Sequence, residues 1–124
     1  MRDTKFSSAV LAIVGLMGVS GVALLAAGAH EDSSGRLTTA GLFILIHGTA
    51  ALAASRGALH PMGRIGVGLL LLGSILFAGD LAIRVTAGAP LLPMIAPIGG
   101  SLTMLGWLVL AIVGGRDFLL KPVK

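Results

Sequence analysis

Four titratable side chains lie inside or at the end of long apolar stretches of this sequence: His30, His47, Asp80 and Arg84. Asp80 precedes Arg84 by four residues, which is the spacing and order that favour an ion pair on a helix. A charge in lipid costs about 2.5 to 3.5 kcal/mol on insertion scales, so we expect Asp80 to face the protein interior. Arg84 can reach the membrane interface and is its first candidate partner.

Two other interpretations of the same carboxylate remain open. In one, Asp80 joins His30 and His47 in a polar pocket that opens to the outer face and binds a proton, a cation or a small polar ligand. In the other, the carboxylate is bonded to the start of the last helix at Gly99 and Gly100, where backbone amides are free to bind an anion. A structural ion pair is the interpretation that we weight most.

His47 also has a simpler interpretation, as a neutral histidine that is hydrogen-bonded across helices. Its candidate partners are the hydroxyl groups of Thr49, Ser74 and Thr103. A metal site that uses both histidines and the aspartate fits the ligand types but not the geometry, because His47 lies about 12 Å below the outer end of its helix. We therefore expect neither a metal nor a cofactor.

The rest of the sequence argues against an enzyme and against nucleic acid as a partner. The chain contains no cysteine, which excludes disulfides and thiolate chemistry. No strand-turn-helix is present to hold a nucleophile, and there is no phosphate-binding loop of the Walker type. The basic residues are scattered without interleaved aromatic residues, unlike a nucleic-acid surface.

The composition indicates that lipid, and not water, surrounds most of the chain. Of 124 residues, 56% are hydrophobic and only 11% are charged, whereas about a quarter of a soluble domain is charged. The apolar residues run on without the alternation of a membrane barrel, so the spanning segments must be helical. We expect an all-α integral membrane protein, with the lipid bilayer around it.

The sequence predicts one membrane domain, 1–124, with four transmembrane helices. Charged and turn-forming residues separate the apolar stretches, each close to the 20 residues that a span needs. Pro90 and Pro93 interrupt the chain before the last helix, and Pro97 suits the first turn of that helix. The expected helices cover residues 7–29, 37–55, 65–84 and 97–115.

Lysine and arginine are distributed unequally between the two sides of such a protein. Seven fall on one side, namely Arg2, Lys5, Arg56, Arg64, Arg116, Lys121 and Lys124, and two on the other, Arg36 and Arg84. The positive-inside rule then places both termini in the cytoplasm. With short connections, the expected architecture is an antiparallel up-down bundle.

Small residues recur at spacings of three and four, as in Gly15, Gly18 and Gly21, and also in Gly48 with Ala51 and Ala111 with Gly114. Such spacing lets helix backbones approach closely. We expect these positions to pack helices within the chain, against another copy or against a larger membrane complex. A weak sequence similarity between segments 21–28 and 73–79 is compatible with a duplicated hairpin, although so biased a composition also produces such similarities by chance.

Several short motifs together resemble a known family. They are Gly28-Ala29-His30, the lone His47, the segment 76–81 that ends in Gly79-Asp80-Leu81, Ala96-Pro97-Ile98-Gly99-Gly100 and Gly106-Trp107-Leu108. The chain resembles the YgdD-like family (DUF423) of small bacterial inner-membrane proteins of unknown function, related to a mitochondrial transmembrane protein. The resemblance implies four helices, a structural role for the motif glycines, Pro97 and Trp107, and a bacterial inner membrane before a mitochondrial one.

Many members of that family have serine in place of Asp80, which argues against an indispensable catalytic role for this carboxylate. The function that we expect is therefore that of a non-enzymatic accessory or structural membrane protein. The alternative is a small carrier or binding protein that uses the outer-side residues His30, His47, Asp80 and Arg84.

Overall fold

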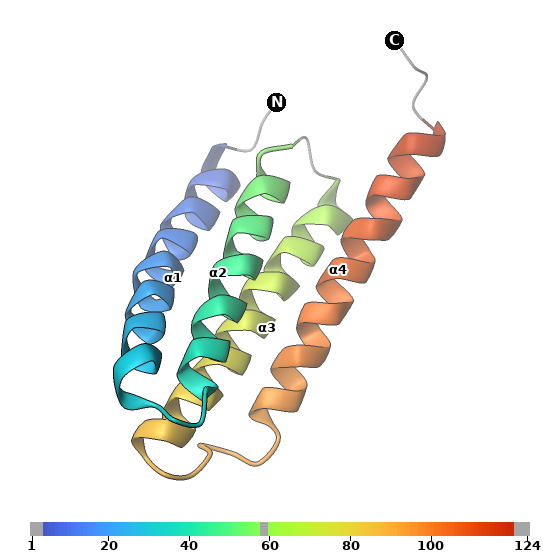
Figure 1. The fold of residues 1–124 in the computed structure, drawn as a ribbon. Coiled ribbons are helices and arrows are strands. Elements are labelled where there is room, and N and C mark those ends of the chain that lie inside the picture. Colours follow the sequence, from blue (N-terminus) through green and yellow to red (C-terminus); the bar gives the residue numbers. More distant parts are fainter. Residues whose placement is uncertain (1–3, 58–59, 121–124) are drawn as a thin grey trace.

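The computed structural model describes residues 4–57 and 60–120, and the regular structure in these ranges is entirely α-helical. The helices are α1 (Thr4–Glu31), α2 (Arg36–Ser55), α3 (Pro61–Thr86) and α4 (Ile95–Leu120) (Figure 1). The all-α class expected from the sequence is confirmed. Three of the counted cations, Arg2, Lys121 and Lys124, lie outside the described residues.

All four helices are long enough to cross a bilayer. They contain 28, 20, 26 and 26 residues, and a rise of 1.5 Å per residue makes them about 30 to 42 Å long. Each includes an apolar stretch of 18 residues with at most two charged side chains. The hydrocarbon core of a membrane is about 30 Å thick, so the chain is a multi-pass membrane protein.

Helix α3 begins earlier than the sequence predicted, at Pro61 instead of residue 65. Proline suits the first helical position because its missing N–H would have no partner there. The preceding residue, His60, caps the helix: its Nδ1 accepts a hydrogen bond from the N–H of Met62 at 3.3 Å. The segment from 61 to 64 was therefore wrongly assigned to a turn.

Helix α4 also differs from its prediction at both ends. It begins at Ile95, so Pro97 lies inside the first turn and does not open it. It continues through Arg116 to Leu120, five residues beyond the predicted end at residue 115. Large apolar side chains, such as Phe118, still follow Arg116, which explains why one arginine does not end the helix.

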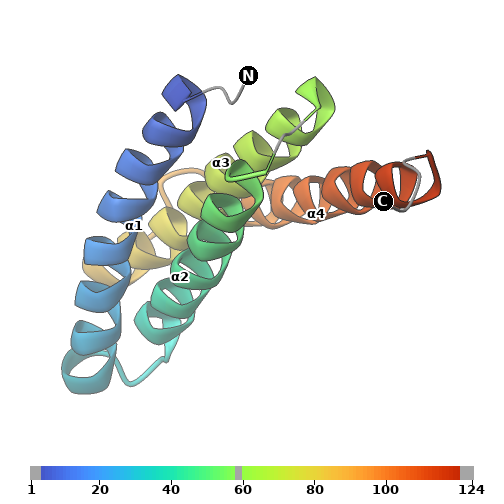
Figure 2. The ribbon, with the colours of Figure 1, turned by 90° about the horizontal axis from the view of Figure 1, so that it is seen from above.

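The helices form an open row. The extensive contacts join neighbours in the sequence: α1 with α2, α2 with α3, and α3 with α4. Figure 2 shows α1 and α4 at the two edges of this row. In Figure 1 the α1–α2 and α3–α4 connections lie at one end of the molecule, and the first and last helical turns of the chain lie at the other.

Glycines make the contact between α1 and α2 close. A Cβ added to Gly41 would lie 2.8 Å from the carbonyl oxygen of Gly21, and one added to Gly28 would lie 2.5 Å from the hydroxyl oxygen of Thr38. A Cβ on Gly21 would meet the side chain of Leu45 at 2.5 Å. Any larger residue would therefore push these two helices apart.

The contact between α3 and α4 is built in the same way. A Cβ on Gly106 would lie 2.9 Å from the carbonyl oxygen of Gly66, and one on Gly73 would lie 2.5 Å from the hydroxyl oxygen of Thr103. A Cβ on Gly66 would meet Leu110 at 3.1 Å. This pair of helices also depends on direct approach of the backbones.

Other glycines that the sequence analysis assigned to packing face open space. A Cβ on Gly15, on Gly18 or on Gly114 would find no atom within 4 Å, whereas Gly21 is packed against α2. Of the triplet on the first helix, Gly21 packs within the chain, which leaves Gly15 and Gly18 for the other expected role, contact with another copy or with a larger membrane complex. Helical rotation is the reason, because a triplet spaced by three residues spreads across about 120° of the helix surface.

Candidate functional site

Asp80 and Arg84 form the ion pair that the sequence predicted. Nε of Arg84 donates a hydrogen bond to Oδ2 of Asp80 at 2.7 Å. Asp80 is 1% exposed, whereas the side chain of Arg84 is 31% exposed. The prediction that the carboxylate faces the interior is confirmed, and the arginine extends from it toward the end of α3.

The second oxygen of this carboxylate is unusual. Oδ1 of Asp80 is buried and has no hydrogen-bond partner among the described residues. The predicted bond to the amides of Gly99 and Gly100 is therefore not formed; α4 begins four residues before Gly99, which places both residues inside the helix. A buried acceptor without a donor carries a desolvation cost of about 1 to 3 kcal/mol, more when it is charged, so Oδ1 could accept a hydrogen bond from a bound donor or bind a cation.

His47 belongs to an aromatic cluster that spans three helices. Its ring centroid lies 4.2 Å from that of Phe43 on α2, and Phe43 lies 4.2 Å from Phe77 on α3. Trp107 on α4 meets the imidazole edge-on at 6.2 Å. Because Trp107 is 45% exposed, this end of the cluster is open to lipid.

The hydrogen bond of His47 stays within its own helix. Nδ1 lies 2.7 Å from the carbonyl oxygen of Phe43; a carbonyl only accepts, so in the neutral ring Nδ1 carries the proton and Nε2 is the acceptor. The three predicted cross-helix partners instead bond to carbonyls of their own helices, as seen for Thr49, Ser74 and Thr103. That prediction was wrong because a hydroxyl on a helix can reach the carbonyl four residues back.

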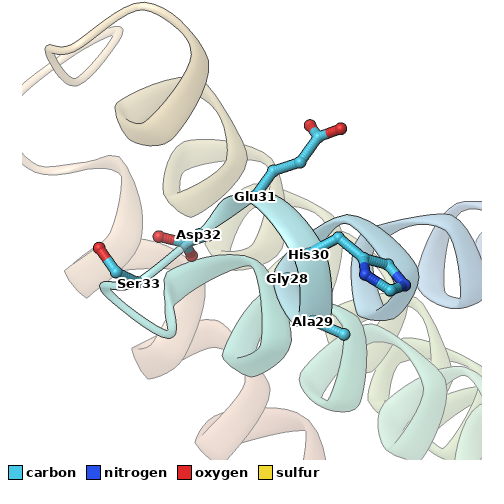
Figure 3. A pocket seen from close by; sticks show the side chains of 6 residues that line it. All are labelled: Gly28, Ala29, His30, Glu31, Asp32 and Ser33. Atoms are coloured by element: carbon cyan, nitrogen blue, oxygen red, sulfur yellow. The ribbon is translucent and has the colours of Figure 1, made fainter.

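His30 lies apart from the other candidates. It is exposed at the end of α1 and lines a shallow hollow made only of residues 28–33. Figure 3 shows the His30 ring and the Glu31 carboxylate pointing in different directions from the end of the helix. Neither His47 nor Asp80 lines this hollow, and the described residues contain no group of three or more possible metal ligands of the His, Cys, Asp or Glu type.

Asp32 has a structural role that the sequence analysis missed. Its Oδ2 accepts the N–H of Leu37 at 2.8 Å, and its Oδ1 accepts both the N–H and the hydroxyl of Ser34. The bond from the Leu37 amide, followed by that from the Ser34 hydroxyl, lowers the pKa of Asp32 below its usual 3.8. An aspartate two residues before a serine and just ahead of an apolar helix is a known capping and turn signature that could have identified it.

The motif residues of the expected family lie mainly at helix contacts. Gly28, Gly99 and Gly106 each face a neighbouring backbone or side chain that a Cβ would strike. Gly100 is less constrained, because the first atom that its Cβ would meet lies 3.9 Å away, on Phe77. These glycines support a structural role for the motif.

A comparison with known families agrees with this geometry. A model described as "Protein of unknown function (DUF423)" matches residues 24–100, which is more than half of the chain. The match covers all four titratable candidates and ends at Gly100, before Gly106 and Trp107. No curated protein and no solved structure matches the chain. This chain belongs to the DUF423 family of proteins of unknown function.

Proposed function

We propose that this protein is a non-enzymatic accessory or structural membrane protein, which packs with itself or with a larger membrane complex. The open glycines of α1 carry this proposal. Gly15 and Gly18 have no neighbour within 4 Å of an added Cβ, yet glycine costs about 1 kcal/mol relative to alanine inside a helix. Lipid chains do not require glycine, whereas a closely packed partner helix does.

The proposed topology is an up-down bundle with both termini in the cytoplasm, in a bacterial inner membrane. The excess of lysine and arginine on one side supports this orientation. The first turn of α1, the last turn of α2, the first turn of α3 and the last turn of α4 lie at the same end of the molecule, which is compatible with it (Figure 1). A mitochondrial inner membrane is the second choice.

Copurification in a mild detergent tests the proposal. The full chain carrying an affinity tag should retain a second, differently tagged copy or a defined set of membrane proteins. Gly18→Leu should weaken this association, because its side chain would occupy the space of the partner. Ser20→Leu is the matched control, since Ser20 is an exposed non-glycine residue of α1 that lies about 200° around the helix from Gly18. A strictly monomeric particle without any partner would refute an accessory role.

A second function is favoured by one observation, the unpartnered buried oxygen of Asp80. The chain would then be a small carrier or binding protein for a proton, a cation or a small polar ligand. Asp80 and Arg84 would form the centre of the site. His47 and His30 would have to approach from α2 and α1, and four helices leave little room for an internal path without a second copy.

Flux measurements in proteoliposomes separate this alternative from the first. Asp80→Asn removes the charge and keeps the shape of the side chain, and His47→Ala removes the imidazole. Both substitutions should reduce proton or cation flux if the carrier proposal is correct. Flux equal to that of the unaltered protein in both variants would end the carrier proposal and leave the accessory proposal intact.

A further inference from the structure

His47 carries a free hydrogen-bond acceptor deep inside the membrane. α2 has 20 residues and is therefore about 30 Å long, close to the thickness of the hydrocarbon layer. His47 lies about 16 Å from the first residue of this helix and about 12 Å from the last. Nδ1 is bonded to the carbonyl of Phe43, so Nε2 is left as the acceptor. None of the described residues donates to Nε2, and this atom is not sealed inside the protein.

Trp107 brings a free donor to the same depth. Its ring meets the imidazole edge-on at 6.2 Å and is 45% exposed. The indole N–H can only donate, and none of the described residues accepts a hydrogen bond from it. Acyl chains can bond to neither group. The corner between α2 and α4, lined by His47 and Trp107, therefore presents a donor and an acceptor that both lack a partner within the hydrocarbon layer.

The depth of this corner limits what can fill it. Ions and lipid headgroups stay near the interfaces, because a charge in hydrocarbon is costly. Two kinds of occupant remain, namely a polar side chain of another transmembrane helix or a molecule dissolved among the acyl chains.

The side chains beside the corner favour the dissolved molecule. Close contact between helices needs small residues, whereas the exposed residues next to His47 and Trp107 along their helices are large: Ile46, Met104 and Leu108, at 56%, 67% and 55%. The open glycines that suit a partner helix, Gly15 and Gly18, lie on α1. A lipid-soluble molecule needs no such close approach of backbones.

The aromatic cluster and the two polar groups define the chemistry of this molecule. The Phe43 ring lies 4.2 Å from that of His47, and the Phe77 ring lies 4.2 Å from that of Phe43, so aromatic surfaces favour a ligand with an aromatic ring. A phenolic hydroxyl both donates and accepts. It can therefore donate to Nε2 of His47 and accept from the N–H of Trp107. A quinone carbonyl only accepts and would leave Nε2 without a donor.

We propose that the corner between α2 and α4 binds a lipid-soluble phenol or quinol, whose hydroxyl lies between His47 and Trp107. Membrane quinols and long-chain phenols share this hydroxylated ring. The site is separate from the ion pair of Asp80 and Arg84, and it does not depend on self-packing through α1. Binding involves no transfer of electrons or protons.

Thermal unfolding of the purified full chain in detergent tests this site, because a ligand that binds the folded state raises the unfolding midpoint. Circular dichroism follows the helices while decylubiquinol or nonylphenol is added, and the midpoint should rise with the concentration of either probe. Decylubiquinone lacks the donor for Nε2 and should bind about fivefold more weakly than decylubiquinol, which is the effect of one hydrogen bond. The hydroxylated probe that binds more tightly identifies the source of the ring.

Two variants remove one polar group each and keep an aromatic ring. His47→Phe should bind decylubiquinol about fivefold more weakly and should no longer prefer it to decylubiquinone. Trp107→Phe should bind both forms more weakly. Phe118→Leu is the matched control, because Phe118 is an 84% exposed aromatic residue near the end of α4, and it should bind like the unaltered protein.

Several results would refute the phenol or quinol site. They are an unchanged midpoint with every probe, equal affinity for decylubiquinol and decylubiquinone in the unaltered protein, and binding that both His47→Phe and Trp107→Phe leave intact. Equal stabilisation by dodecanol, which has a hydroxyl and a long chain but no ring, would exclude an aromatic ligand. An oligomer that both variants convert into a monomer would show that a helix of another copy fills the corner; it would refute the ligand site and leave self-packing in place.

Discussion

The two hairpins share one packing scheme and differ in what they carry. In both, glycines and a threonine bring the helix backbones together at equivalent positions. The first hairpin is closed by the short connection 32–35, held by Asp32, whereas the second has the longer connection 87–94 with two prolines. In the part of the chain that the structure describes, the buried ion pair of Asp80 and Arg84 lies in the second hairpin, where Asp80 is seven residues beyond Gly73; α1 ends three residues beyond Gly28, before the corresponding position.

This difference separates the contacts that hold a hairpin together from the charged residues that could bind a ligand. The glycine contacts occur in both halves, whereas the buried ion pair of Asp80 and Arg84 lies in the second. The ion pair is an addition to one half, where it lies on the side of α3 that faces the start of α4. If the protein binds a cation or a polar ligand through a charged side chain, the second hairpin is therefore the place to look for it.

The largest expected effect concerns this added ion pair. Arg84→Ala leaves the carboxylate of Asp80 buried without a partner, and breaking a buried pair costs roughly 3 to 5 kcal/mol. The partial exposure of Arg84 places the expected loss of unfolding free energy near the lower value. Unfolding by denaturant in detergent micelles measures it.

The double variant Asp80→Ala with Arg84→Ala provides the control for that experiment, because it removes the orphan charge as well. It should be more stable than Arg84→Ala alone. A double variant that is less stable than Arg84→Ala would contradict the assignment of the cost to an unpaired carboxylate.

A smaller effect, equal in the two halves, is expected at the equivalent glycines Gly28 and Gly73. Each Cβ would lie 2.5 Å from a threonine hydroxyl oxygen and less than 3 Å from the amide nitrogen of the same residue, so the helices must move apart. Overpacking of this kind costs about 1 to 3 kcal/mol. Gly28→Ala and Gly73→Ala should lower the thermal unfolding midpoint by similar amounts.

Gly114→Ala serves as the reference, because its methyl group enters open space and alanine is the better helix former. It should leave the midpoint unchanged or raise it slightly. A large loss in only one of Gly28→Ala and Gly73→Ala would break the equivalence of the hairpins.

The smallest effect concerns the connection in the first hairpin and depends on pH. The hydrogen bonds from Leu37 and Ser34 hold the pKa of Asp32 below 3.8 in the folded protein, so its stabilising contribution is complete above about pH 5 and is lost as pH falls through the folded-state pKa. Asp32→Asn should show less loss of stability between pH 5 and pH 3 than the unaltered protein. Parallel pH profiles in the two proteins would show that Asp32 does not hold the loop.

Part of the candidate site could be predicted from single residues and their spacing. Asp80 turned inward because an ion in lipid is costly, and Arg84 paired with it because four residues make one helical turn. The hydrogen bond of His47 could not be predicted, because its own helix and three neighbouring hydroxyls compete on equal terms in the sequence. Asp32 was overlooked because its partner, Leu37, is defined only when the start of α2 is known.

The sequence by itself determined the four helices and the membrane as their solvent, since these depend on apolar length and on the need to satisfy backbone hydrogen bonds within each segment. The tertiary structure decided which glycines are packed and which are open, the matching contacts of the two hairpins and the open row of helices. These features depend on the rotation of each helix about its axis. Without a polar face toward water, no pattern of hydrophobicity fixes that rotation, and only the contact between backbones does.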